Sequence, residues 1–224
     1  MALLVGIDGT GPFFNSTYAK EFEESFVNRI VRDSRIGGPD KRYFRGPIGA
    51  GGGMPEAING GYDFIKRRRG EGNTSPILLT GYSRGAMGVG VIAKYLKDDD
   101  IPVAALLMFD CVDRHVRYDF ETIPDNVAKV LHLRRDAKAG SRESFGNDGT
   151  LYSSATDYKE TFYVCTHGGV GGTPWKLADG QDQRDFIDEG APDGITNIRF
   201  YEDKIVSDRI WADVRPFITN NGFM

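Results

Sequence analysis

Residues 76–86 read Pro-Ile-Leu-Leu-Thr-Gly-Tyr-Ser-Arg-Gly-Ala. The apolar run before Thr80 is typical of a buried strand, and residues 86–97 are typical of a helix. Ser83 lies between them in the pattern Gly-x-Ser-x-Gly, the setting of a nucleophile elbow, in which the serine occupies a strained turn. Glycine fits on both sides because a side chain there would collide with the strand or the helix. We therefore predict that Ser83 is a nucleophile; the alternative is that it only caps the helix.

The alternation of strand and helix continues along the whole chain. Apolar strands that alternate with helices indicate a parallel sheet covered on both sides. The sequence predicts strands at 2–7, 41–44, 76–80, 102–109, 127–133 and 161–165. It predicts helices at 17–32, 55–69, 86–97 and 205–218. The expected fold is α/β, of the α/β-hydrolase type, with a mostly parallel sheet and helices on both faces, and residues 1–224 are expected to form a single domain.

The composition is that of a soluble globular protein. Of 224 residues, 40% are hydrophobic and 27% are charged, and the formal net charge is -4. This charge gives no overall attraction to nucleic acid. No apolar stretch reaches the roughly 20 residues that span a bilayer. The run at 1–7 is too short for a secretion signal, so a cytoplasmic location is expected, with export by a signal-independent system as the alternative.

The two cysteines and the single cationic run are expected to have structural roles. Cys111 and Cys165 are too few for a disulfide framework or a zinc site, so we expect both to be buried and reduced, and we expect no metal or other cofactor. The run from Lys66 to Arg69 ends a predicted helix, where cations complement the helix dipole. A contact with an anionic substrate or a peripheral contact with a membrane is the alternative for this run.

Reactive residue types follow the predicted strands. Asp8, Ser83, Asp110 and His167 each lie within a few residues of the end of a strand. Ligands of open parallel sheets bind outside the carboxyl ends of the strands. We therefore expect these four residues to meet at one edge of the sheet.

A serine nucleophile needs a base, and the chain has three histidines. His132 lies inside an apolar run and is expected to be a buried side chain with its hydrogen bonds satisfied. His115 follows Asp113-Arg114 and is expected to be a solvated surface residue, with substrate binding as the alternative. His167 follows a predicted strand and precedes a run of glycines that can bring its ring over the serine. We predict that His167 is the base.

The base must in turn be oriented by an acid. Asp110 ends the strand after the elbow helix, and the order Ser83, Asp110, His167 is that of α/β-hydrolases. Asp136, after the next predicted strand, is the main rival, and Asp113 is the third candidate. The position of the strand ends decides among them.

An oxyanion needs backbone donors. The N–H of Arg84 is one candidate, and the N–H of Gly9 or Thr10 in the first turn is the other. Asp8 is expected either to cap its own turn or to pair with the Arg84 guanidinium, which otherwise opposes the helix dipole. Candidates for substrate contact or support are Asp8, Tyr82, His115 and Asp113.

Four motifs resemble a known family. They are Asp8-Gly-Thr-Gly11, Gly81-Tyr-Ser-Arg-Gly-Ala86, Phe109-Asp-Cys-Val112 and His167-Gly-Gly-Val-Gly-Gly172. In this order they resemble the type VI secretion lipase effector catalytic-domain family, an α/β-hydrolase domain. The loop at 46–53 with Tyr62, and Arg142 with Phe145, extend the resemblance to about residues 2 to 175.

The resemblance implies a Ser83–Asp110–His167 triad and activity on carboxylic esters, including phospholipids in the antibacterial effector members. Two features depart from the family. The family usually has an aspartate in the segment after its histidine, where this chain has Gly169 or its neighbours. The chain is also short, with no identifiable insertion or membrane-facing module.

The sequence thus predicts a serine hydrolase that cleaves small-molecule esters or lipids. The alternative is an inactive hydrolase fold that serves as a binding or interaction protein. Phosphate or nucleotide binding by the loop at 49–53 is a weaker interpretation, because the loop lacks the Lys-Ser/Thr pair of a P-loop and the glycine spacing of a dinucleotide site.

Overall fold

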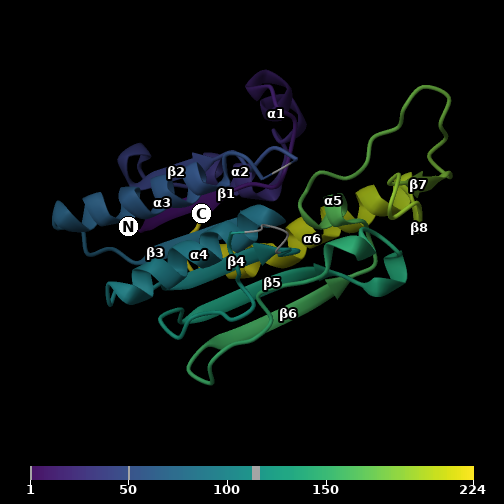
Figure 1. The fold of residues 1–224 in the computed structure, drawn as a ribbon. Coiled ribbons are helices and arrows are strands. Elements are labelled where there is room, and N and C mark those ends of the chain that lie inside the picture. Colours follow the sequence, from purple (N-terminus) through teal and green to yellow (C-terminus); the bar gives the residue numbers. More distant parts are fainter. Residues whose placement is uncertain (1, 50, 113–116) are drawn as a thin grey trace.

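A six-stranded sheet forms the centre of the molecule in the computed structural model, which describes residues 2–49, 51–112 and 117–224 (Figure 1). Its strand order is β2-β1-β3-β4-β5-β6, and every neighbouring pair is parallel. The strands are β1 (Leu3–Ile7), β2 (Lys41–Phe44), β3 (Ile77–Tyr82), β4 (Ala105–Phe109), β5 (Lys129–Arg135) and β6 (Asp157–Tyr163). This topology confirms the predicted α/β-hydrolase-like fold.

Helices cover both faces of the sheet. Helices α3 (Met54–Gly70) and α4 (Arg84–Asp98) pack on one face. Helices α2 (Phe26–Asp33) and α6 (Phe200–Asn220) pack on the other. Successive residues of β1 alternate between the two resulting cores, as the period of a strand requires. The four basic residues from 66 to 69 lie at the C-terminal end of α3, and both cysteines are buried and free, as predicted.

The predicted helix at 17–32 is wrong in one respect, because the chain forms two helices there. They are α1 (Asn15–Glu21) and α2, and the chain breaks between them. The Ser25 side chain caps α2 by accepting a hydrogen bond from the Asn28 N–H. Its hydroxyl also donates to the buried Asp8 carboxylate. This polar junction interrupts the apolar period that suggested a single helix.

The last strand and the region after it also differ from the prediction. β6 begins four residues before the predicted start at Thr161, and its side chains are mostly exposed because it is the edge strand. Beyond α5 (His167–Val170), an antiparallel hairpin of β7 (Phe186–Asp188) and β8 (Ile195–Arg199) forms a second small sheet. Three short 3₁₀ helices complete the described elements: η1 (Gly38–Asp40), η2 (Ala137–Ala139) and η3 (Glu143–Phe145). Among the described residues, no helix is long and apolar enough to cross a membrane.

Candidate active site

Ser83 occupies the sharp turn between β3 and α4. Its φ of 57° and ψ of -131° lie outside the conformations that residues with a side chain ordinarily adopt. A Cβ at Gly85 would lie 2.3 Å from backbone oxygens of β1 and of Asp8, and one at Gly81 would meet the backbone of α4. The Ser83 side chain makes no capping hydrogen bond to α4. The turn thus presents the hydroxyl away from the helix, as an elbow does, rather than capping the helix.

Three side chains from distant parts of the sequence form a continuous line of hydrogen bonds. The Ser83 Oγ and His167 Nε2 atoms are 2.9 Å apart. The His167 Nδ1 and Asp110 Oδ2 atoms are 2.6 Å apart. Ser83 follows β3, Asp110 follows β4, and His167 begins α5 just beyond β6, so parallel strands bring them to one edge. The structure therefore joins the three residues that the sequence nominated.

Asp110 is fully buried and remains an anion because of its partners. Burial raises its pKa, but the hydrogen bond and charge of His167 and the charge of Arg135 outweigh this effect and hold the pKa at about 2. The Arg135 guanidinium reaches Asp110 Oδ2 at 2.6 Å, and the Arg135 N–H donates to Oδ1 at 3.1 Å. A carboxylate of this kind can orient the imidazole and stabilise it when it gains a proton.

The backbone of His167 is held from two sides. Its N–H donates to Ser141 Oγ at 2.8 Å, and its carbonyl accepts the Tyr82 hydroxyl at 3.2 Å. The Tyr82 ring centroid is 5.0 Å from that of His167, and the Phe145 ring meets the imidazole edge-on at 5.3 Å. Tyr82 therefore helps to hold the His167 backbone and ring in place. Of the two roles predicted for Tyr82, substrate contact and support, these contacts correspond to support.

The structure places the rival residues elsewhere. Asp136 caps the 3₁₀ helix after β5 by accepting the Lys138 N–H. His132 is buried: its Nε2 accepts the Cys111 N–H at 3.1 Å, and burial followed by the charge of Arg134 lowers its pKa to about 3. This is the satisfied interior histidine that the sequence predicted. Asp113 and His115, the remaining candidates, lie outside the described residues.

The first turn corrects one predicted oxyanion donor. The Gly9 N–H donates to Asp8 Oδ1 at 2.9 Å and is therefore already engaged. The Thr10 N–H, by contrast, has no acceptor among the residues that the structure describes, and Thr10 lines the cavity beside Ser83. Arg84 is the first residue of α4 and directly follows Ser83. Thr10 and Arg84 are thus the two remaining backbone candidates.

The predicted pairing of Asp8 with the Arg84 guanidinium is wrong. Asp8 is fully buried and accepts hydrogen bonds from Gly9, from the Ser25 hydroxyl and, at 3.0 Å, from the Tyr43 hydroxyl. Burial raises the pKa of Asp8 to about 7 despite these bonds. The Arg84 guanidinium instead donates to the Gly49 carbonyl at 3.0 Å and lies 3.4 Å from Thr10 Oγ1. The alternative prediction, that Asp8 caps its own turn, is confirmed.

Several residues of the site carried no signal in the sequence. Arg135 binds Asp110, and Ser141 binds both the His167 N–H and, at 2.9 Å, Glu189 Oε1. Asp203 of α6 binds the residue before His167. Each contact joins segments that are far apart in the chain, and no local motif marks any of these residues. The end of a predicted strand lies close to Arg135, and the resemblance at Arg142 and Phe145 lies close to Ser141.

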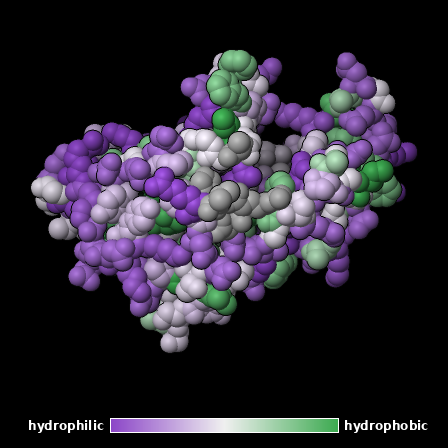
Figure 2. Space-filling view, in the orientation of Figure 1, coloured by the Kyte–Doolittle hydropathy of each residue, from purple (hydrophilic) through white to green (hydrophobic). Residues whose placement is uncertain are grey.

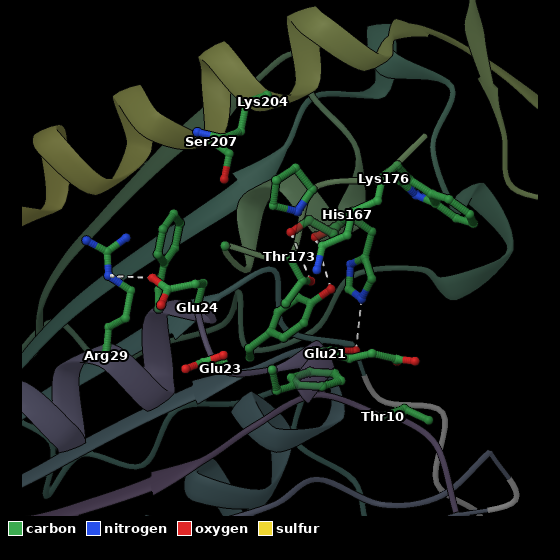
Figure 3. Close-up of a pocket in the computed structure, with 18 of the residues that line it drawn as sticks. Thr10, Glu21, Glu23, Glu24, Arg29, His167, Thr173, Lys176, Lys204 and Ser207 are labelled. Carbon is green, nitrogen blue, oxygen red and sulfur yellow. Dashed lines mark hydrogen bonds and ion pairs between the residues drawn. The ribbon is translucent and has the colours of Figure 1, made fainter. Parts of the chain in front are cut away.

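A cavity of about 880 Å³ opens beside Ser83 and His167. Figure 3 shows that it extends from Thr10 and His167 toward Arg29 on α2 and Lys204 on α6. The lining combines apolar surface with charged side chains, which include Glu21, Glu24, Arg29, Arg142, Lys176 and Lys204. Its apolar part is mainly aromatic: Phe22, Phe26, Phe145 and Trp175.

The face drawn in Figure 2 is largely hydrophilic. Hydrophobic surface on it gathers at two projections, near α1 and near the β7–β8 hairpin (Figure 2). Phe13 and Phe14 precede α1 and are 70% and 69% exposed, and Ile195 of the hairpin is 69% exposed. These three side chains lie outside the cavity lining.

No protein-family model matches the sequence, and no curated protein does. Solved structures do match. An arylesterase is 13% identical with a TM-score of 0.46 over 77% of this chain and 70% of its own. A protein of unknown function from Agrobacterium tumefaciens is 13% identical with a TM-score of 0.45, over 99% of this chain and 91% of its own. An uncharacterized protein from Pseudomonas aeruginosa is 14% identical with a TM-score of 0.41, over 76% of this chain but only 41% of its own.

At these identities the structures are similar in fold alone. The resemblance to the type VI secretion lipase effectors is carried by the short motifs alone. A His167 ring beyond hydrogen-bonding reach of Ser83 would have favoured the alternative of an inactive binding protein, and the distance is 2.9 Å.

Proposed function

We propose that this protein is a serine hydrolase that cleaves carboxylic esters through an acyl-enzyme. The observation that carries the proposal is the unbroken line from Ser83 Oγ through both ring nitrogens of His167 to the Asp110 carboxylate. Such a line activates a weak nucleophile, because the base removes the hydroxyl proton and the acid fixes the tautomer of the base. Helix capping or packing would not require the three groups to be hydrogen-bonded in series.

The proposed reaction has two halves. Ser83 Oγ attacks the ester carbonyl carbon while its proton passes to His167 Nε2. The bond between the carbonyl carbon and the leaving oxygen then breaks, and His167 returns the proton to the departing alkoxide. Water attacks the acyl-enzyme with His167 again as base, which releases the carboxylic acid and restores the serine. Asp110 stays ionised throughout and stabilises the imidazolium form of His167.

The oxyanion of each tetrahedral intermediate needs two donors near Ser83. We assign the backbone N–H groups of Arg84 and Thr10 to this role. The first lies at the start of α4, where the helix dipole favours negative charge. The second lies in the turn after β1, which the buried Asp8 holds through Gly9. The side chains of these two residues lie 3.4 Å apart at their closest polar atoms.

The lining of the cavity favours a compact ester with polar groups over a long-chain lipid. A cavity of about 880 Å³ is of the size that holds a small-molecule ligand. The charged side chains in the lining include Arg29, Arg142 and Glu189. Packing a fatty acyl chain against them would cost free energy, because these groups would lose hydration without gaining polar partners. Phospholipid cleavage, which the family resemblance implies, is the alternative substrate class.

The substrate class is tested by hydrolysis of nitrophenyl acetate, butyrate and palmitate beside phosphatidylethanolamine vesicles. We expect kcat/KM to fall as the acyl chain lengthens and the vesicles to be poor substrates. Ser83→Ala should abolish turnover, whereas Ser154→Ala, at an exposed serine on a loop, should match the wild type. Turnover that rises with chain length would contradict the polar-ester assignment, and turnover retained in Ser83→Ala would contradict the mechanism.

A further inference from the structure

Arg135 is a buried cation at the carboxyl end of β5, and only 6% of its side chain is exposed. Its guanidinium binds Asp110 Oδ2 at 2.6 Å and also donates to three backbone carbonyls of the following loop. These are the carbonyls of Ser141 at 2.9 Å, Arg142 at 3.0 Å and Gly146 at 2.8 Å. One side chain therefore ties the acid of the proposed triad to the loop at 141–146.

The loop that Arg135 holds is itself in contact with His167. Ser141 Oγ accepts the His167 N–H, and the Phe145 ring lies against the imidazole. The Ser141 hydroxyl donates onward to the buried Glu189. Arg135 thus reaches the histidine by two routes, one through the carboxylate and one through the backbone of the loop.

Arg135 and His167 share a single oxygen, Oδ2 of Asp110, each at 2.6 Å. An ion pair that only stabilised the fold could form equally well at Oδ1, the carboxylate oxygen that His167 does not contact. A cation on that oxygen withdraws part of the negative charge that would otherwise favour the protonated ring. Arg135 and the imidazole therefore share the charge of this one carboxylate oxygen.

We propose that Arg135 is a positioning residue of the Ser83–His167–Asp110 site, which orients the acid and the loop at 141–146 and limits the charge that Asp110 presents to His167. The proposal rests on the proposed function for its kinetic consequences. The geometric part of the proposal depends only on the contacts above. Among the described residues, other titratable or charged groups near the ring include Tyr82 on β3 and, across Ser141, Glu189 and Arg142.

The test compares Arg135→Gln, Arg135→Lys and the matched control Arg134→Gln. Arg134 is the preceding residue on β5 and pairs with Glu160 at the sheet edge, outside the site. Turnover of nitrophenyl butyrate is measured from pH 5 to 9, and the ring signals of His167 are titrated by NMR, with their assignment from His167→Gln. Thermal unfolding gives the folded fraction of each variant.

Arg135→Gln is expected to lower kcat by about 100-fold with little change in KM. It should also move the acid limb of the kcat profile and the NMR midpoint of His167 upward by about one pH unit. Arg135→Lys keeps the charge but cannot reach all three carbonyls, so it should keep the wild-type midpoint and lose about 10-fold in kcat. Arg134→Gln should leave kcat, the acid limb of kcat and the NMR midpoint of His167 unchanged.

Wild-type kcat and an unshifted midpoint in folded Arg135→Gln would overturn the proposal. If Arg135→Gln does not fold, wild-type kcat in Arg135→Lys overturns it instead. An NMR midpoint that moves upward in a protein without esterase activity would support the role of Arg135 and contradict the proposed function, so the two failures are distinguishable.

Discussion

Asp203 on α6 accepts two hydrogen bonds from Thr166, the residue immediately before His167. The Thr166 N–H lies 2.8 Å from Asp203 Oδ1, and the Thr166 hydroxyl lies 2.9 Å from Oδ2. The Thr166 hydroxyl also caps α5 by accepting the Gly169 N–H. A Cβ at Gly169 would lie only 2.4 Å from Asp203 Oδ1. A carboxylate from the last helix therefore lies against the segment that begins with His167.

Asp203→Ala should loosen the start of α5 and with it the proposed base. It leaves the buried Thr166 N–H without its acceptor, which costs about 2 kcal/mol of unfolding free energy. We expect a matching loss in chemical denaturation and a drop in kcat of about 10-fold. Asp208→Ala on the same helix removes an exposed carboxylate that pairs with Lys204, and the stability of this variant should stay within about 0.5 kcal/mol of the wild type. Equal behaviour of the two variants would contradict the role of Asp203.

Asp110→Asn tests which aspartate is the acid. The amide cannot hold His167 in the required tautomer, so kcat should fall by about 10³-fold or more. It also leaves the buried Arg135 without its counter-ion, which should destabilise the fold by about 3 kcal/mol. Asp136→Asn changes only the cap of a 3₁₀ helix and should retain kcat within about twofold. The assignment fails if the Asp136 variant is the one that loses activity.

Gly85→Ala tests the steric basis of the elbow. A methyl group there would meet the backbone oxygens of Ile7 and Asp8 at 2.3 Å, and backbone of the central sheet cannot move aside. We expect a loss of about 3 kcal/mol or more, read from the denaturation midpoint. Gly70→Ala, in the last turn of α3, meets no atom within 4 Å and should be neutral or slightly stabilising. Wild-type stability in Gly85→Ala would show that the strand and helix do not approach this closely.

Asp8 makes the stability of the fold depend on pH. Its pKa is raised from 3.8 to about 7 by burial, so between these values the folded state keeps a proton that the unfolded chain has lost. The unfolding free energy should therefore fall as the pH rises from about 4 to 7, by up to a few kcal/mol. Asp8→Asn removes the titration. Denaturation at pH 5 and pH 8 should give a smaller difference for the variant, and an equal difference would contradict a raised pKa.

The sequence predicted the parallel sheet and its helices because buried strands are apolar throughout and glycine is obligatory where strand and helix meet. It predicted the meeting of Ser83, Asp110 and His167 because parallel strands end at one edge. Only the end of edge strand β6 was predicted, because the exposed side chains of its first residues form no apolar run. The single predicted helix at 17–32 failed because Ser25 is recruited by Asp8, a contact across 17 residues.

The supporting residues of the site could not be read from the sequence for a related reason. Arg135, Ser141, Glu189 and Asp203 act through partners that are distant in the chain, and each residue alone is an ordinary polar side chain. The position of Gly9 in the turn after the first strand predicts an oxyanion donor. In the structure, however, the Gly9 N–H donates to the neighbouring Asp8 carboxylate, a contact that the sequence does not reveal.

Reaction with a fluorophosphonate, followed by intact mass and peptide mapping, tests the central claim most directly. A serine whose proton is removed by His167 should form one stoichiometric adduct, on Ser83, and His167→Gln should slow its formation by about 10³-fold or more. The account predicts no adduct in Ser83→Ala. A native protein that stays unlabelled, or one labelled at another serine, would contradict it.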